Sequence, residues 1–140
     1  MNTDLLLLKS LETLANLDSN NNFFESMIPF GNIAFIKEKF WKLSPQYIKP
    51  GEKRSSHPGL SISSDKNIVI FGSSQLSNRN PKSKNYFFVN HDECAILSRN
   101  VVFIFDTQIP ATIDMIDIKK TYYEPLCEKK MKELKDAGYK

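Results

Sequence analysis

Two short segments of the chain contain side chains that can transfer protons and bind an anion. The basic segment Lys53–Gly59 contributes His57, and Gly72–Gln75 contributes the hydroxyls of Ser73 and Ser74. An unperturbed imidazole titrates near neutral pH, so it can give or accept a proton there. Hydroxyl and cationic groups donate hydrogen bonds to negatively charged oxygens. This combination of groups suits chemistry at a phosphodiester.

The strands predicted around these segments would bring them side by side. Leu60–Ser63 alternates apolar and polar residues, which indicates a half-buried strand, and Ile68–Phe71 is a short apolar run typical of a buried one. If the two strands form an antiparallel hairpin through residues 64–66, the beginning of the first lies beside the end of the second. We therefore expect His57 close to the two serines.

These groups match what cleavage of RNA by its own 2′-hydroxyl requires. A base removes the hydroxyl proton, an acid protonates the leaving 5′-oxygen, and donors stabilise the extra negative charge of the phosphorane. None of these steps needs a metal. The residues alone leave a structural alternative open, in which Ser73–Gln75 forms a turn and His57 lies in a solvated loop before Pro58.

The sequence offers little for a metal or a cofactor. His57 and His91 are isolated, and the run His91–Cys94 is rich in ligand types but consecutive, so its side chains would seldom converge on one ion. Two cysteines, Cys94 and Cys127, exclude a four-thiolate zinc site and a disulfide scaffold. Neither glycine-rich phosphate-binding motif occurs. We expect no metal ion and no cofactor.

The order of the predicted elements indicates a mainly β fold with flanking helices. A helix is expected over Thr3–Leu17, which has leucines at helical spacing, and another over Pro125–Ala137, with Gly138 as its stop. The strand candidates between them are close together and have no helix among them, which favours a small barrel or packed sheets of about six strands. The remaining candidates are Asn32–Phe40, Tyr86–Val89, Val101–Phe105 and Thr112–Ile118.

The composition is that of one soluble domain. The chain has 140 residues, of which 41% are hydrophobic and 25% charged, and this argues against disorder. Its net charge of +3 is mildly basic and compatible with an anionic partner. The apolar run Leu5–Leu8 is too short for a signal peptide or a membrane span. We expect a cytoplasmic protein that does not associate with membranes.

Several short motifs, in order along the chain, resemble those of the MazF/PemK family of type II toxins. That family has Gly-Asp-Ile before a strand, a loop ending Gly-x-Arg-Pro, a strand Val-Leu-Val-Ile-Ser, a strand ending Thr-Ser-Gln, a strand Ser-Val-Val, and Asp-Gln-x-Arg-Thr-Ile-Asp. The segments that resemble them here are Gly31–Ile33, Ser56–Ser63, Ile68–Gln75, Ser98–Phe105 and Asp106–Asp114.

The resemblance implies an SH3-like β-barrel domain at residues 29–140, and the helix expected over Thr3–Leu17 makes residues 1–28 a helical extension outside the family core. It implies a ribosome-independent endoribonuclease toxin that cuts single-stranded RNA and acts as a homodimer. It also implies a cognate antitoxin whose flexible acidic segment covers the RNA groove. The basic loops Lys37–Ser56 and Leu76–Lys84 would suit such a partner.

The chain departs from the family at cationic positions. His57 stands where the family has arginine before proline, Ala111 where it has arginine before Thr-Ile-Asp, and Ile104 where one branch has arginine. Arginine is fully charged at neutral pH and can hold a phosphate by two bonds, whereas histidine is charged only in part. The alternative to a ribonuclease is therefore a non-catalytic module that binds nucleic acid or a protein.

The expected site combines the motif residues with nearby cations. We expect His57 to act as acid, base or phosphate donor, and Ser73 and Ser74 to contact the scissile phosphate. Asp106 would serve as a base or orient the histidine, and Gln108 is its alternative counterpart because this segment is longer than the motif. The residues expected to bind the substrate are Lys53, Arg54, Gln75, Arg79, Lys82 and Gln108.

Overall fold

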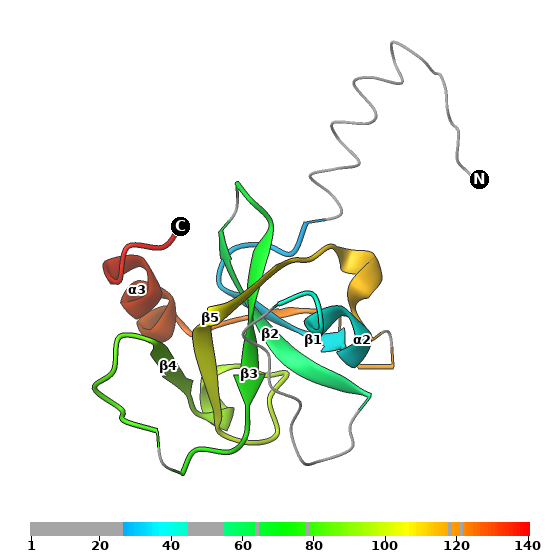
Figure 1. Ribbon diagram of the computed structural model, residues 1–140. Coiled ribbons are helices and arrows are strands. Elements are labelled where there is room, and N and C mark those ends of the chain that lie inside the picture. The colour runs from blue at the N-terminus through cyan, green and yellow to red at the C-terminus, as the bar shows by residue number, and fades with distance from the viewer. Residues whose placement is uncertain (1–26, 45–54, 64, 78, 118, 121) are drawn as a thin grey trace, which may run out of the picture.

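An antiparallel sheet of six strands, curled on itself, dominates the part of the protein that the computed structural model describes (Figure 1). The described residues are 27–44, 55–63, 65–77, 79–117, 119–120 and 122–140. The strands lie in the order β4-β5-β3-β2-β1-β6 across the sheet. Their bounds are β1 Asn32–Lys37, β2 Ser56–Ser63, β3 Ile68–Ser73, β4 Tyr86–Val89, β5 Val101–Pro110 and β6 Glu124–Pro125.

Short helical segments connect and flank these strands. α2 (Glu38–Trp41) follows β1 directly, and the 3-10 turn η1 (His91–Glu93) lies between β4 and β5. A second 3-10 turn, η2 (Ile113–Met115), follows β5, and α3 (Glu128–Asp136) closes the chain. Among the helices described, none has the length and apolar character that crossing a bilayer requires.

The mainly β architecture with a C-terminal helix is confirmed, but the sixth strand was predicted in the wrong place. In its described part, residues 112–117, the segment Thr112–Ile118 contains η2 and forms isolated bridges to Met27 and Ile36, whereas the two-residue β6 occupies the edge of the sheet. Pro125, expected to open the last helix, pairs instead with Asn32 of β1. Proline is tolerated on an edge strand, where its missing N–H costs no ladder bond. The predicted helix Thr3–Leu17 lies outside the described residues.

The start of β2 and the end of β1 also differ from the prediction. The sequence predicts β2 from Leu60, but the strand begins at Ser56 because Pro58 and Gly59 pair with β1 rather than forming a turn. Gly59 fits there because a Cβ at this position would lie 3.0 Å from Cζ2 of Trp41. Trp41 itself belongs to α2, which replaces the last part of the longer strand predicted after Asn32.

The β2–β3 hairpin forms as predicted. Leu60 pairs with Ile70 and Gly59 with Phe71 in antiparallel register. The first residues of β2 therefore lie beside the last residues of β3, which is the juxtaposition that the candidate site requires.

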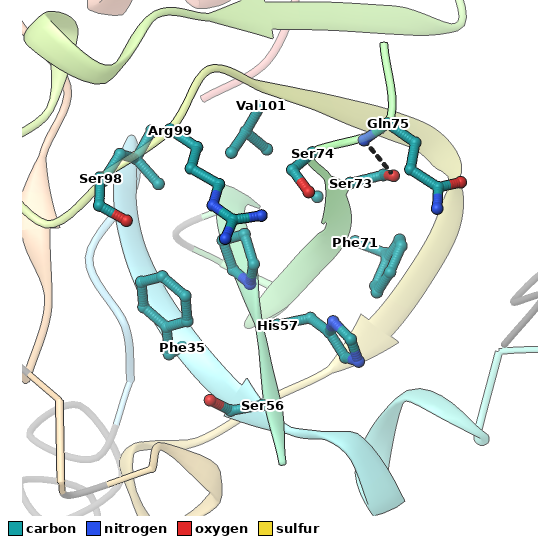
Figure 2. A pocket seen from close by; sticks show the side chains of 13 residues that line it. Phe35, Ser56, His57, Phe71, Ser73, Ser74, Gln75, Ser98, Arg99 and Val101 are labelled. Carbon is teal, nitrogen blue, oxygen red and sulfur yellow. Dashed lines mark hydrogen bonds between the residues drawn. The ribbon is translucent and has the colours of Figure 1, made fainter. Parts of the chain in front are cut away.

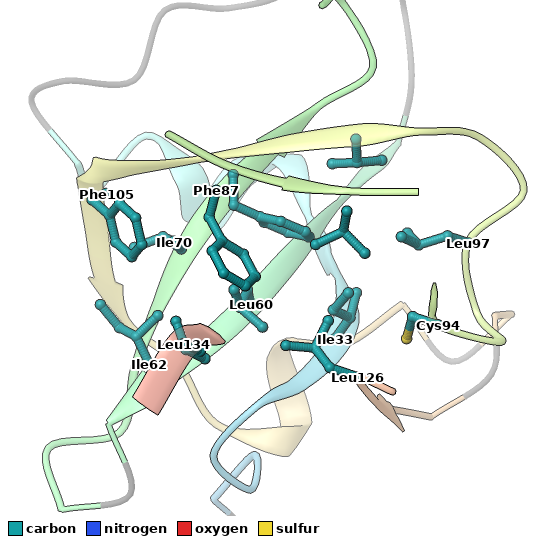
Figure 3. Close-up of a cluster of buried hydrophobic side chains, with 13 residues drawn as sticks. Ile33, Leu60, Ile62, Ile70, Phe87, Cys94, Leu97, Phe105, Leu126 and Leu134 are labelled. Carbon is teal, nitrogen blue, oxygen red and sulfur yellow. The ribbon is translucent and has the colours of Figure 1, made fainter. Parts of the chain in front are cut away.

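Buried side chains form two clusters, one on each side of the sheet. In β3, for example, Ile70 belongs to the first cluster, whereas Val69 and Phe71 belong to the second. Leu134 of α3 completes the first cluster, and Trp41 of α2 belongs to the second. Figure 3 shows the first cluster, with Ile33, Leu60, Ile62, Ile70, Phe87, Leu97, Phe105, Leu126 and Leu134 among its members.

A bulge in β5 separates the two halves of that strand. Ile70 pairs with Gln108, but the next residue, Phe71, pairs with Ile104, so β5 carries three extra residues there. Thr107 fills the gap, because its hydroxyl accepts a hydrogen bond from the Phe71 N–H at 2.8 Å and donates one to the Ile104 carbonyl at 2.6 Å. The bulge changes the direction of the strand and contributes to the curl of the sheet.

Candidate functional site

A small open pocket lies where β2 begins and β3 ends, beside the loop that leads into β5 (Figure 2). Its volume is about 60 Å³, enough for a charged group or a few waters rather than a whole nucleotide. It contains an imidazole, a guanidinium and several hydroxyls between aromatic walls. The residues that line it are Phe35, Ser56, His57, Pro58, Phe71, Gly72, Ser73, Ser74, Gln75, Leu97, Ser98, Arg99 and Val101.

His57 is held at the pocket by the sheet and by contacts between aromatic rings. Its backbone pairs with Ile36 of β1, and only 4% of the residue is exposed. Its ring centroid lies 5.2 Å from that of Phe71, which in turn meets Trp41 edge to face at 5.2 Å. The imidazole therefore has one defined position, unlike a histidine in a solvated loop.

The hydroxyls of Ser73 and Ser74 lie at the end of β3, on the other side of the pocket (Figure 2). The Oγ of Ser73 accepts a hydrogen bond from the Gln75 N–H at 3.1 Å. Because the hydroxyl acts as an acceptor in that bond, its own proton can still be donated to a ligand. Gly72 allows the strand to approach β5 closely, since a Cβ there would lie 2.7 Å from both Phe103 and Val101.

Arg99 is the residue of this site that the sequence reasoning missed. It follows Leu97 and Ser98 in the loop before β5, and its guanidinium reaches over the pocket between Phe35 and Ser74 (Figure 2). The signal available in the sequence was its place beside Ser98, at the start of a segment that already resembled a family strand. The position of a loop residue relative to β2 and β3 depends on tertiary structure, so spacing alone did not identify it.

The electrostatic character of the pocket favours an anion. Among the described residues that line it there is no Asp or Glu, and the guanidinium of Arg99 carries a permanent positive charge. Lys120 adds a second cation nearby, with its Nζ 5.2 Å from the ring centroid of Phe35. Arg79 lies close as well, because its Nε donates to the Gln75 carbonyl at 3.0 Å.

The structure brings four of the predicted site residues together and leaves the others apart. His57, Ser73, Ser74 and Gln75 all line the pocket. Two others, Asp106 at the β5 bulge and Gln108, are exposed and do not line it. Arg79 and Lys82 follow Gln75 along the chain without lining the pocket, and Lys53 and Arg54 lie outside the described residues.

The placement of Asp106 bears on its predicted role. The sequence suggested that it orients His57 or acts as a base, but it stands on the bulge of β5, opposite the step from Ile70 to Phe71. A direct role in a reaction at the pocket is therefore not supported by this geometry. Within the described residues, no three His, Cys, Asp or Glu side chains converge as ligands for a metal ion.

Comparison of the sequence with known protein families gives no match, and no curated protein matches it significantly.

Proposed function

We propose that the protein is a metal-independent endoribonuclease that cleaves single-stranded RNA, in the manner of a MazF/PemK-like toxin. The observation that carries the proposal is the pocket lined by His57, two serine hydroxyls and Arg99, with no carboxylate among its described lining residues. A proton-transfer group, neutral donors and a cation are the groups that cleavage by the 2′-hydroxyl needs. Single-stranded RNA is favoured as substrate because its backbone can adopt the in-line geometry of that attack.

In the proposed reaction, His57 acts as one of the two proton-transfer groups. As a base it takes the proton of the 2′-hydroxyl while the 2′-oxygen attacks phosphorus, and the bond from phosphorus to the 5′-oxygen breaks. Solvent returns a proton to the leaving 5′-oxygen. Ser73 and Ser74 donate hydrogen bonds to the non-bridging oxygens, whose charge increases in the transition state. The products are a 2′,3′-cyclic phosphate end and a 5′-hydroxyl end.

The test is cleavage of a long, weakly structured RNA in EDTA, with mapping of the new ends. Replacing His57 with alanine is expected to lower kcat/KM by about 10²- to 10⁴-fold, the usual contribution of a positioned acid or base. Ser73→Ala is expected to lower it by about 10²-fold, because one transition-state donor is lost. Cleavage at recurrent short motifs, with cyclic phosphate ends, would support the proposal.

The chain offers matched controls for both variants. His91 is exposed in η1 and does not line the pocket, so His91→Ala removes an imidazole while its backbone N–H stays in place, and Ser77→Ala removes an exposed hydroxyl. Both are expected to cleave like the wild type. RNA cleavage that persists in His57→Ala would contradict the proposal, since it would come from another site or a contaminant. Saturable RNA binding without cleavage would favour the non-catalytic module instead.

The same proposal extends to the fold type and to the partners. The curled antiparallel sheet supports an SH3-like barrel, and the mildly basic net charge supports an acidic partner. We propose that the protein forms a homodimer and is neutralised by an antitoxin with a flexible acidic segment. Competition between that segment and RNA for the pocket is the expected means of inhibition.

A further inference from the structure

Arg99 sits on a short loop whose two ends are anchored in the hydrophobic core. Leu97 before it and Val101 after it are 6% and 4% exposed, and both belong to the first core cluster. The Leu97 N–H also donates to the Cys94 carbonyl at 3.1 Å. Only Ser98, Arg99 and Asn100 span the distance between the anchors, so the backbone of the arginine has little freedom to move away from the pocket.

A second set of contacts ties this loop to η1. The Oδ1 atom of Asn100 accepts a hydrogen bond from the His91 N–H at 2.9 Å. The η1 turn is itself capped, because the Asn90 N–H donates to Oε1 of Glu93 at 2.8 Å. The Cys127 N–H donates to the Glu93 carbonyl at 2.8 Å and joins the turn to the beginning of α3. The loop that carries Arg99 is therefore positioned from both ends and from the side.

Stabilising the negative charge of the proposed reaction requires a permanent cation, and Arg99 is the lining residue that supplies one. Histidine is charged only in part at neutral pH, and its proton is used if it acts as an acid or base. The serine hydroxyls donate hydrogen bonds but carry no charge. Within the described lining, Arg99 is the remaining basic side chain.

We propose that Arg99 is the phosphate-binding residue of the site, which holds the non-bridging oxygens of the scissile phosphate through two of its N–H groups. This inference rests on the proposed function, and it assigns to a loop residue the charge stabilisation that His57 cannot supply alone. The planar guanidinium suits two parallel bonds to a phosphate, whereas an ammonium acts as a point charge. The contact strengthens as the phosphorane gains negative charge, so it contributes to the rate as well as to binding.

The binding part of the proposal is tested without cleavage. The probe is a short single-stranded RNA with a 2′-O-methyl group at every position, which lacks the attacking hydroxyl, and its affinity is measured by fluorescence anisotropy over a range of salt concentrations. Each phosphate contact to a single strand contributes about 0.7 to the slope of log affinity against log salt. Arg99→Ala is expected to reduce that slope by about this amount and to weaken binding about tenfold.

Two further variants make the binding result specific. Arg99→Lys keeps the charge and is expected to keep most of the salt slope. Lys135→Ala removes an exposed cation from the last turn of α3, away from the pocket lining, and is expected to leave both slope and affinity unchanged. Equal slopes for the wild type and Arg99→Ala would overturn the inference, as would an equal loss in Lys135→Ala.

The cleavage part uses the unmodified RNA and separates this inference from the proposed function. Both Arg99→Ala and Arg99→Lys are expected to lower kcat/KM, the alanine variant by about 10²- to 10³-fold, because lysine does not restore the two-bond geometry. If the wild type cleaves and Arg99→Ala cleaves equally well, the proposed function stands and the inference fails. If the wild type binds with an Arg99-dependent slope but does not cleave, the phosphate site stands and the ribonuclease fails. No binding by the wild type would overturn both.

Discussion

The residues of the candidate site offer three different kinds of functional group. His57 offers an imidazole, the side chain most often used for proton transfer, whereas Arg99 offers a planar guanidinium that can hold a phosphate by two bonds. Ser73 and Ser74 supply neutral hydroxyl donors. The site therefore does not lack a cation although position 57 is a histidine, because Arg99 brings one from a different part of the chain.

A single buried thiol, that of Cys94, is expected to make the stability of the fold depend on pH. Burial raises the pKa of the Cys94 thiol above its ordinary value, because the thiolate loses solvation in the core. Above about pH 8.5 the unfolded chain therefore loses a proton that the folded chain keeps. The free energy of unfolding is expected to fall as the pH rises through this range, because the unfolded state binds fewer protons.

Replacing Cys94 with alanine isolates this contribution. The difference in unfolding free energy between the wild type and Cys94→Ala, measured by urea denaturation, is expected to shrink between pH 7.5 and about pH 10. A difference for Cys94→Ala that is constant with pH would show that its thiol does not stay protonated in the fold.

The sequence predicted one part of the site and missed another for physical reasons. His57 and Ser73 were placed together because a hairpin with a short connection has few possible registers. Arg99 was missed because nothing local in the sequence relates a loop before β5 to the beginning of β2. Asp106 was included because of its motif, but the β5 bulge at that point shifts the register by three residues and leaves it outside the pocket.

At the scale of elements, the loop before β5 is the part of the fold on which the site depends most. Asn100 makes no contribution to the pocket lining, yet its side chain holds the backbone of η1. We regard it as a positioning residue for Arg99. A small displacement of a catalytic or binding group can cost a large factor in rate, although the fold remains intact.

Asn100→Ala should therefore impair activity more than stability. The variant loses the oxygen that accepts the His91 N–H, and kcat/KM for RNA cleavage is expected to fall by about 10- to 100-fold. Because the bond is exposed, water replaces it, and the free energy of unfolding should change by less than about 1 kcal/mol. Asn100→Asp keeps an acceptor oxygen at the same place and is expected to restore most of the rate. An aspartate variant as slow as the alanine variant would argue against the positioning role.

The element boundaries show where local patterns are overridden by tertiary contacts. Pro58 and Gly59 have the composition of a turn, but they continue β2 because β1 offers pairing partners and Trp41 needs the space above the glycine. Pro125 has the position of a helix start, but the edge of the sheet offers a pairing site at Asn32. Propensity ranks the options for such residues, and the neighbouring strands decide between them.

At the scale of the whole molecule, the pocket lies where the two core clusters meet. Phe71 on its wall belongs to the second cluster, whereas Leu97 and Val101 belong to the first. One wall of the pocket is therefore held by the cluster on one side of the sheet, and the other wall by the cluster on the opposite side. The geometry between His57 and Arg99 is then a property of the complete domain, and it is maintained only while both clusters are packed.

The two clusters are expected to unfold as one cooperative unit. Leu134 and Ile109 are almost fully buried, one in each cluster, so Leu134→Ala should lower the free energy of unfolding by about 2–5 kcal/mol and Ile109→Val by about 0.5–1.5 kcal/mol. The double variant should show the sum within about 0.5 kcal/mol, because distant sites behave independently. Far-ultraviolet circular dichroism and tryptophan fluorescence of Trp41 should report the same urea midpoint in each variant. If the two probes separate, with fluorescence unchanged in Leu134→Ala while the circular dichroism shifts, the clusters unfold independently and the pocket can lose one wall while the other stays folded.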